Sequence, residues 1–308
     1  MKAMGPLKVY RTAWSRRRTS VALDLANGRA LPNAVVIGAG KGGTSWLYRA
    51  FSEHPEIFVP PLKVTGPLNE VHFFTDRYDL GVEHYARYFD GSSGVPVRVD
   101  VSPRYLFHKH LPIAARMHAL LPDARLVASL RDPVSRAWSR FRHSIQNGTL
   151  PPWSRFREVI TDQHFYDMYV HYGFYAEHLE RYFEHYPRSQ VKVVFYEDMA
   201  QNAQTYLQDI LDFLQVDVDF KPRSLYDRVN TGGASYLSEL VAYALVAAGG
   251  RAGKVAVRAW RSAQRPSKFS RRRVPMDRDV RAFLEDTYAE PNAKLCALLG
   301  RPVPFLRS

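Results

Sequence analysis

Short runs of apolar and β-branched residues recur along the chain, and segments with helical spacing separate them. The runs that predict strands cover residues 34–37, 57–59, 97–101, 125–130 and 191–196. The segments that predict helices cover residues 44–53, 81–89, 111–121, 133–145, 173–187, 201–214, 237–248 and 276–299, the last with a break at Pro291. Strands and helices that alternate at these lengths predict an α/β fold, with a P-loop-like, doubly wound parallel sheet flanked by helices.

The predicted elements fit a single domain over residues 33–302. A basic arm precedes it over residues 1–32, and a short tail follows it over residues 303–308. The arm is expected to be solvated, with a weak contact to an anionic membrane surface left open as an alternative.

A glycine-rich loop follows the first predicted strand. Glycines at 38, 40, 42 and 43 let the backbone bend tightly and approach a ligand without side chains in the way. Thr44 and Ser45 are expected to cap the helix that follows, and Lys41 adds a positive charge. A strand, a glycine loop and a helix N-terminus together predict a site for a phosphate group.

The order of residues in this loop differs from that of nucleotide triphosphatases. Their loop places the lysine directly before the hydroxyl residue. Here Lys41 comes before Gly42, Gly43 and Thr44. A nucleotide-dependent kinase of the P-loop fold is therefore disfavoured, also because no aspartate pattern typical of a magnesium site follows.

The hexapeptide over residues 69–74, N-E-V-H-F-F, is a second candidate site. In an extended segment Glu70 and His72 would lie on one face, with Val71 and Phe73 on the other. A carboxylate beside an imidazole, shortly after a phosphate loop, suits proton abstraction from an acceptor. The alternative is a surface strand that carries an ordinary paired glutamate.

A third candidate site begins at the end of the strand over residues 125–130. Arg131 follows this strand, and Asp132 and Pro133 are expected to form the N-cap and first position of the next helix. Ser135 and Ser139 lie one turn apart on one face of that helix. A purely structural role explains the cap but not an arginine and a serine at this spacing.

The charge balance agrees with an anionic ligand. The 308 residues carry a formal net charge of +13, which nucleic acid, an acidic lipid surface or an anionic cofactor could each explain. The basic residues cluster near the ligand loops rather than along one helix face, which disfavours a nucleic-acid-binding protein.

Three features of the sequence bear on the location of the protein. Cys296 is the single cysteine, the longest apolar run is short, and the arm lacks the pattern of a signal peptide. We therefore expect a cytoplasmic protein.

Together these motifs resemble those of sulfotransferases that use 3′-phosphoadenosine 5′-phosphosulfate (PAPS), of the heparan-sulfate and bacterial types. The resemblance rests on K-G-G-T-S with His54-Pro55 after its helix, on N-E-V-H-F-F, on Asp100 followed by S-P-R-Y, and on L-R-D-P-V-S-R-A-W-S. It implies a sulfuryl transfer in which PAPS is the co-substrate and no metal takes part.

The resemblance also assigns roles to residues. Lys41, Gly42, Gly43, Thr44 and Ser45 would bind the 5′-phosphosulfate, and Arg131 and Ser139 would bind the 3′-phosphate, over which Arg271, Arg272 and Arg273 would close. Glu70 would be the general base, with His72 beside it, and Asp100 would orient the acceptor. Val101 stands where glycosaminoglycan enzymes often carry a lysine. The acceptor therefore stays open among a small molecule, a glycan and a lipid, and the oligomeric state is not predicted.

Overall fold

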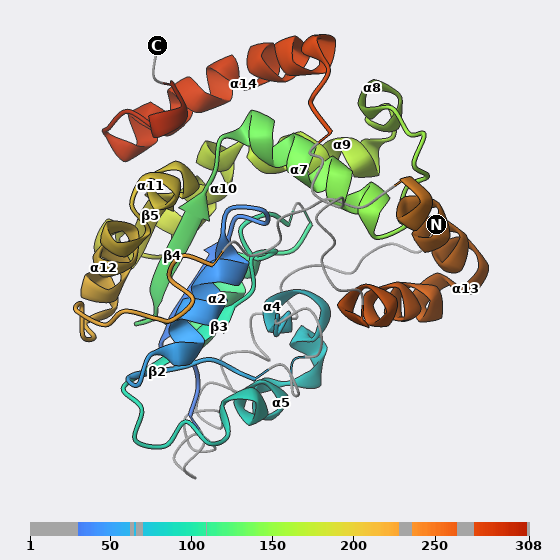
Figure 1. Cartoon of the computed structure of the whole chain (residues 1–308). Coiled ribbons are helices and arrows are strands. Elements are labelled where there is room, and N and C mark those ends of the chain that lie inside the picture. The colour runs from blue at the N-terminus through green and yellow to red at the C-terminus, as the bar shows by residue number, and fades with distance from the viewer. Residues whose placement is uncertain are drawn as a thin grey trace, which may run out of the picture.

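Five parallel strands form one sheet in the computed structural model, which describes residues 30–61, 65, 70–108, 110–227, 236–263 and 274–306 (Figure 1). The strands are β1 (Ala34–Gly38), β2 (Ile57–Phe58), β3 (Val97–Val101), β4 (Arg125–Leu130) and β5 (Val191–Phe195), in the order β2-β3-β1-β4-β5. The predicted parallel α/β sheet is confirmed. Because β1 is central, the loop that follows it opens at the middle of the sheet's carboxyl edge, where ligands bind in such folds.

Helices cover both faces of this sheet. One face carries α2 (Thr44–Glu53) and α12 (Ala203–Leu214), and the other carries α6 (Ile113–Leu120) and α10 (Tyr175–Phe183). Each face has its own apolar cluster, and the side chains of β1 alternate between them. Ala34 and Val36 pack on the face of α2 and α12, and Val35 and Ile37 pack on the face of α6 and α10. All four are buried, which explains why the strand reads as an unbroken apolar run.

A third apolar cluster lies beside the sheet and supports the candidate site. It joins α7 (Pro133–Gln146), α8 (Phe156–Val159), α9 (Gln163–Tyr169) and α14 (Arg278–Leu299). Three shorter helices are α4 (Phe73–Asp76), α5 (Val82–Ala86) and α11 (Tyr196–Gln201). Through this cluster, α7 packs against both α9 and α14.

Two helices differ from the sequence prediction. Helix α13 (Tyr236–Ala263) continues well past residue 248, with a kink at Gly250, where φ is 50°. A glycine adopts this φ without steric cost, so a second helical stretch can follow directly. Helix α14 runs through Pro291 as one element, and the predicted break is wrong. Tyr288 and Leu295 are buried on either side of this proline, so packing holds both halves in place.

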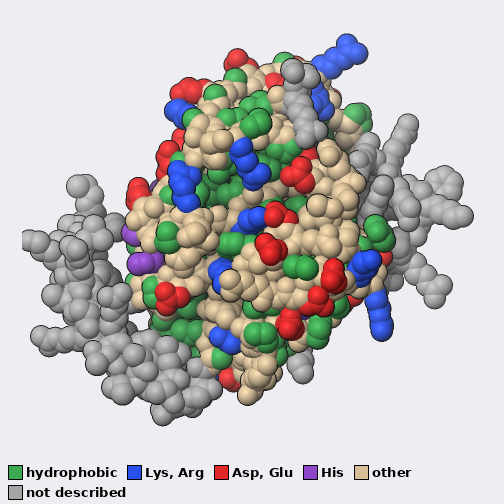
Figure 2. Space-filling view, turned by 90° about the vertical axis from the view of Figure 1, so that its left-hand side faces the viewer, with side chains coloured by type: hydrophobic (Ala, Val, Ile, Leu, Met, Phe, Trp, Pro, Cys, Tyr) green, Lys and Arg blue, Asp and Glu red, His purple; other side chains and the backbone are tan. Residues whose placement is uncertain are grey.

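Basic and acidic side chains are interspersed on the face shown in Figure 2, so the positive charge does not form one continuous patch there. Within the described residues, no helix is both long and apolar enough to cross a bilayer. Residues 1–29 of the basic arm lie outside the described residues, and the predicted domain boundaries stay predictions.

Candidate active site

The loop between β1 and α2 is built tightly against the neighbouring strand β4. The N–H of Ala39 donates to the Ser129 carbonyl at 2.7 Å, and the Ser129 hydroxyl donates to the Gly42 carbonyl. A Cβ at Gly42 would overlap the Ser129 carbonyl oxygen, and Gly43 has a φ of 93°. These two positions therefore require glycine for different reasons, one for close approach and one for backbone conformation.

The start of α2 lacks the predicted side-chain caps. Gly43 is the N-cap residue, and no side chain accepts a hydrogen bond from the first turn. Thr44 is buried and Ser45 is exposed, but neither precedes the helix as a cap must. The first N–H groups of α2 are consequently left available to a ligand.

Backbone N–H groups of the loop divide into two sets. The N–H of Gly42 donates to the Ala39 carbonyl at 2.9 Å, and the N–H of Gly40 donates to the Tyr172 hydroxyl at 2.9 Å. In the hydrogen bonds of the described chain, four N–H groups of this segment have no acceptor: those of Lys41, Gly43, Thr44 and Ser45. Four free donors at a helix N-terminus make a cradle for an anion, as the sequence predicts, although the Gly42 N–H is not part of it.

Three cations interact beside this cradle: Lys41, Arg131 and Arg140. Arg131 reaches the loop, since its Nη1 donates to the Lys41 carbonyl at 3.4 Å. Burial, then the charges of Arg140 and Arg131, lower the pKa of Lys41 to about 8. None of the three forms an ion pair with a carboxylate of the described residues. Unpaired cations that repel one another at a partly buried site indicate a ligand with several negative charges.

The start of α7 holds Arg131 in place. Asp132 is the N-cap, and its carboxylate accepts from the N–H groups of Val134 and Ser135 at 3.2 and 3.1 Å, as predicted. The Tyr175 hydroxyl donates to the Arg131 carbonyl at 2.8 Å, and the guanidinium of Arg131 lies 4.7 Å from the centre of the Tyr196 ring. Ser139 lies further along α7 and is half-buried.

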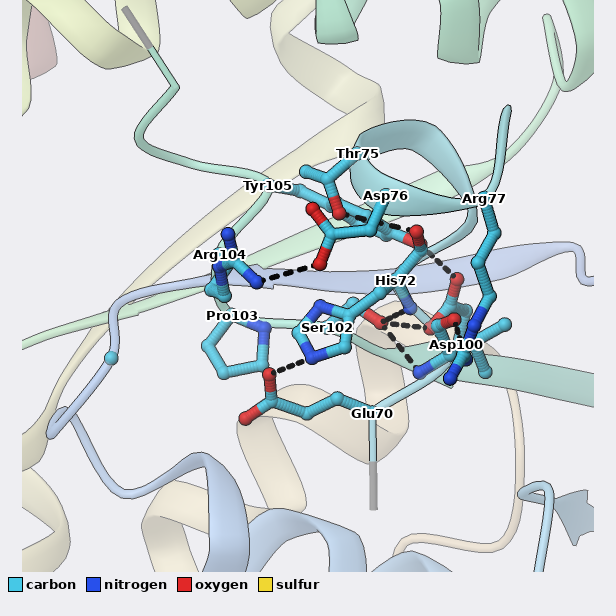
Figure 3. Close-up of polar contacts among 12 residues, drawn as sticks. Glu70, His72, Thr75, Asp76, Arg77, Asp100, Ser102, Pro103, Arg104 and Tyr105 are labelled. Carbon is cyan, nitrogen blue, oxygen red and sulfur yellow. Dashed lines mark hydrogen bonds and ion pairs between the residues drawn. The ribbon is translucent and has the colours of Figure 1, made fainter. Parts of the chain in front are cut away.

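Glu70 and His72 meet, but not in the predicted way. His72 has a φ of 55° and precedes α4, so the prediction of an extended segment is wrong. The turn nevertheless brings His72 Nε2 within 2.9 Å of Glu70 Oε2 (Figure 3). The Glu70 side chain is 21% exposed and that of His72 only 6%. The carboxylate can therefore meet a ligand from solvent, whereas the imidazole supports it from inside.

A buried network fixes the backbone of this turn. The Ser102 hydroxyl accepts from the N–H groups of Val71 and His72 at 3.1 and 3.3 Å, and donates to Asp100 at 2.6 Å (Figure 3). Asp100 also accepts from the hydroxyls of Tyr85 and Tyr105 at 2.8 and 3.0 Å.

Burial of Asp100 is complete, which raises the pKa of its carboxyl, and these hydrogen bonds oppose the rise. Because its oxygens already accept three hydroxyl donors, Asp100 can act on an acceptor only indirectly, by holding the Glu70–His72 turn through Ser102.

Two residues of the site, Tyr172 and Arg140, belong to no motif and were not predicted from the sequence. Tyr172 links the N–H of Gly40 to the carbonyl of Pro103, which its hydroxyl also contacts, and so joins the glycine loop to the segment after β3. Arg140 lies one turn after Arg136 on α7 and contributes the third cation. An unexpected arginine beside Ser139 was the one available signal for it.

Some predicted site residues cannot be placed. Asn69, Arg271, Arg272 and Arg273 lie outside the described residues. Within the described part of the chain, no group of three or more His, Cys, Asp or Glu side chains is arranged to hold a metal ion. That the reaction needs no metal stays a prediction.

Comparison with known proteins gives a consistent set of relatives. Residues 31–231, more than half of the chain, match the family model described as the sulfotransferase domain. The chain is 28% identical over 244 residues to the bifunctional heparan sulfate N-deacetylase/N-sulfotransferase of Drosophila melanogaster, covering 71% of this chain and 22% of that protein. It is also 28% identical over 200 residues to the human heparan sulfate glucosamine 3-O-sulfotransferase 3A1, covering 63% of this chain and 47% of that protein.

The chain thus spans less than half the length of these two curated relatives. Among solved structures, a sulfotransferase from Alicyclobacillus acidocaldarius superposes with a TM-score of 0.66 at 26% identity. The superposition covers 91% of this chain and 100% of that one.

Proposed function

Because this chain belongs to the sulfotransferase family, we propose that it transfers the sulfuryl group of PAPS to a hydroxyl or an amine of an acceptor molecule. The observation that carries this proposal is made at the end of β1, where three cations without a described carboxylate partner meet four backbone N–H groups without a described acceptor. PAPS has anionic groups at two positions of the nucleotide, and such a site would offset their charge.

The loop and α7 would each hold one end of the nucleotide. Lys41 and the free N–H groups of the loop would hold the 5′-phosphosulfate, by charge and by the helix N-terminus together. Arg131 and Ser139 would hold the 3′-phosphate. Closure by Arg271, Arg272 and Arg273 stays a prediction of the family resemblance.

Glu70 would accept the proton of the acceptor. As the acceptor oxygen or nitrogen forms a bond to sulfur, the bond between sulfur and the bridging phosphate oxygen breaks, and its electron pair leaves with adenosine 3′,5′-bisphosphate. The carboxylate of Glu70 takes the acceptor proton, while Lys41 offsets the charge that grows on the departing phosphate. His72, 2.9 Å from Glu70, would keep the carboxylate oriented.

The names of the relatives support a glycan as the first acceptor to test, since both act on heparan sulfate. Val101 argues for testing small molecules and lipids beside it. A cytoplasmic location and the lack of nucleic-acid binding stay predictions.

Binding of adenosine 3′,5′-bisphosphate is expected to raise the melting temperature. At a concentration of about 100 times Kd it would add about 2.7 kcal/mol to the free energy of unfolding, which shifts the melting temperature by several degrees. ATP and AMP, which lack a 3′-phosphate, should shift it much less. A thermal-shift titration with the three nucleotides checks this. Equal shifts would remove the case for a 3′-phosphate site and with it the proposed co-substrate.

Affinity for the same nucleotide is expected to fall as the pH rises above 8. The pKa of Lys41 is lowered to about 8 in the free protein, and a bound phosphate would raise it again, so binding takes up a proton. At pH 9 the affinity should be about tenfold weaker than at pH 7. Calorimetry in buffers of different ionisation enthalpy measures the proton uptake.

The Lys41→Met variant is the control for this pH dependence. It should bind more weakly, with an affinity that stays flat between pH 7 and pH 9. The lowered pKa also means that the unfolded chain holds more protons at Lys41 between pH 8 and 10.5. The contribution of Lys41 to the free energy of unfolding of the ligand-free protein should therefore increase as the pH rises through that range. A wild-type affinity that does not change with pH would contradict the role of Lys41.

A further inference from the structure

Arg140 is a cation of the site that no motif explains. It follows Ser139 on α7, and its side chain is mostly shielded from solvent. In the described chain its guanidinium makes one hydrogen bond, to the Met168 sulfur at 3.3 Å. A thioether is a weak acceptor, so this contact does not offset the cost of shielding a guanidinium from water.

The surroundings of Arg140 connect it to the glycine loop. Arg136 lies one turn earlier on the same face of α7, and its guanidinium lies 4.9 Å from the centre of the Tyr172 ring. The Tyr172 hydroxyl in turn accepts from the Gly40 N–H at 2.9 Å. The face of α7 that carries Arg140 is thus packed toward the loop residue next to Lys41.

Tyr172 also leads from this face of α7 to the proposed base, because its hydroxyl contacts the Pro103 carbonyl and Pro103 follows Ser102, which holds the turn that carries Glu70. The charges agree with this position of Arg140. After burial, Arg140 is the group that most lowers the pKa of Lys41, more than Arg131 does. Burial lowers the pKa of Arg140 itself, and the Glu70 carboxylate is among the groups that oppose this shift. Arg140 therefore interacts with Lys41 and with Glu70, although no described carboxylate pairs with it.

This position is where the sulfuryl group would pass. If Lys41 holds the 5′-phosphate and Glu70 faces the acceptor, the transferred group lies between them. We propose that Arg140 forms a sulfuryl subsite and donates to the oxygens of the group being transferred. This inference rests on the proposed function. A guanidinium is a planar fork of donors, which suits two oxygens of one tetrahedral anion better than a point charge does.

The subsite should distinguish PAPS from adenosine 3′,5′-bisphosphate, because the product lacks the sulfuryl group. The Arg140→Met variant keeps an unbranched apolar stem and removes the guanidinium with its donors. Its affinity for PAPS should fall by about tenfold to hundredfold, the worth of a hydrogen bond to a charged group. Its affinity for adenosine 3′,5′-bisphosphate should stay within about threefold of wild type.

The dissociation constants of both nucleotides are to be measured by calorimetry on the full chain without an acceptor. Arg87→Met, which removes an exposed arginine elsewhere, is the matched control and should change neither constant. Arg140→Lys should recover part of the PAPS affinity, since it restores the charge without the fork. If the methionine variant does not fold, the lysine variant still reports on the ratio of the two constants.

An equal loss of affinity for both nucleotides would overturn the proposal, because it would make Arg140 a support for the loop. An unchanged ratio with a raised KM for the acceptor would overturn it as well, by assigning Arg140 to acceptor binding. Failure of the proposed function is distinguishable from both, since the wild-type protein would then not bind adenosine 3′,5′-bisphosphate at all.

Discussion

The Glu70→Gln variant is expected to lose about a hundredfold to ten-thousandfold in turnover, the usual worth of general-base catalysis. Glutamine keeps the shape of the side chain but cannot accept the proton of an acceptor. Nucleotide binding should barely change, because Lys41, the loop N–H groups and Arg131, rather than Glu70, would hold the nucleotide. Turnover is to be measured with labelled PAPS, and slow hydrolysis of PAPS by water can stand in until an acceptor is known.

His72 is the rival base and needs its own variant. In the proposed arrangement His72→Ala should lower turnover less than Glu70→Gln, because the imidazole is buried and supports the carboxylate. Glu83→Gln, which alters an exposed carboxylate on α5, should leave turnover unchanged. Near-normal turnover in Glu70→Gln together with an inactive His72→Ala enzyme would transfer the role to His72.

The Arg131→Ala variant is expected to bind adenosine 3′,5′-bisphosphate more weakly by about 2–4 kcal/mol, the cost of truncating one partner of a buried charge pair. Ser139→Ala should cost about 1–2 kcal/mol, since it removes one hydroxyl donor to a charged group. Calorimetric titration of both variants measures these losses.

AMP provides the control for this experiment, because it lacks the 3′-phosphate. Both variants should bind AMP about as weakly as the wild-type protein does. If either variant lost affinity for AMP by the same factor as for the bisphosphate, its effect would come from the loop. Arg131 does touch the loop, at the Lys41 carbonyl, so this comparison is needed.

Much of the fold could be predicted from local pattern, since strands buried on both faces must be apolar throughout. The five strands and the Asp132 cap at the start of α7 follow from a few neighbouring residues each. The Glu70–His72 pair was predicted for the wrong reason. Alternating residues share a face in an extended segment, which is why the pair was expected. In the structure the backbone instead forms a turn, which is hydrogen-bonded to Ser102, some thirty residues away in the chain.

Contacts between distant residues also account for what the sequence did not reveal. Tyr172 meets Gly40 across 132 positions, and α7, which carries Arg140, packs on α9 and on the segment that follows it. A single sequence shows the apolar periodicity of α7 but not which of its polar side chains will face the loop.

The anchor that Asp100 and Ser102 form has a consequence for protein engineering. It fixes the turn that carries Glu70 to the end of β3, within the sheet itself, and makes no use of α8, α9 or α13. New sequence is best grafted into exposed positions of α13, since α8 and α9 belong to the cluster that holds α7. Such a graft, for instance to recruit a different acceptor, should leave the base registered against the glycine loop. Changes at Tyr85 or Tyr105 would misalign it even though neither residue would touch the graft.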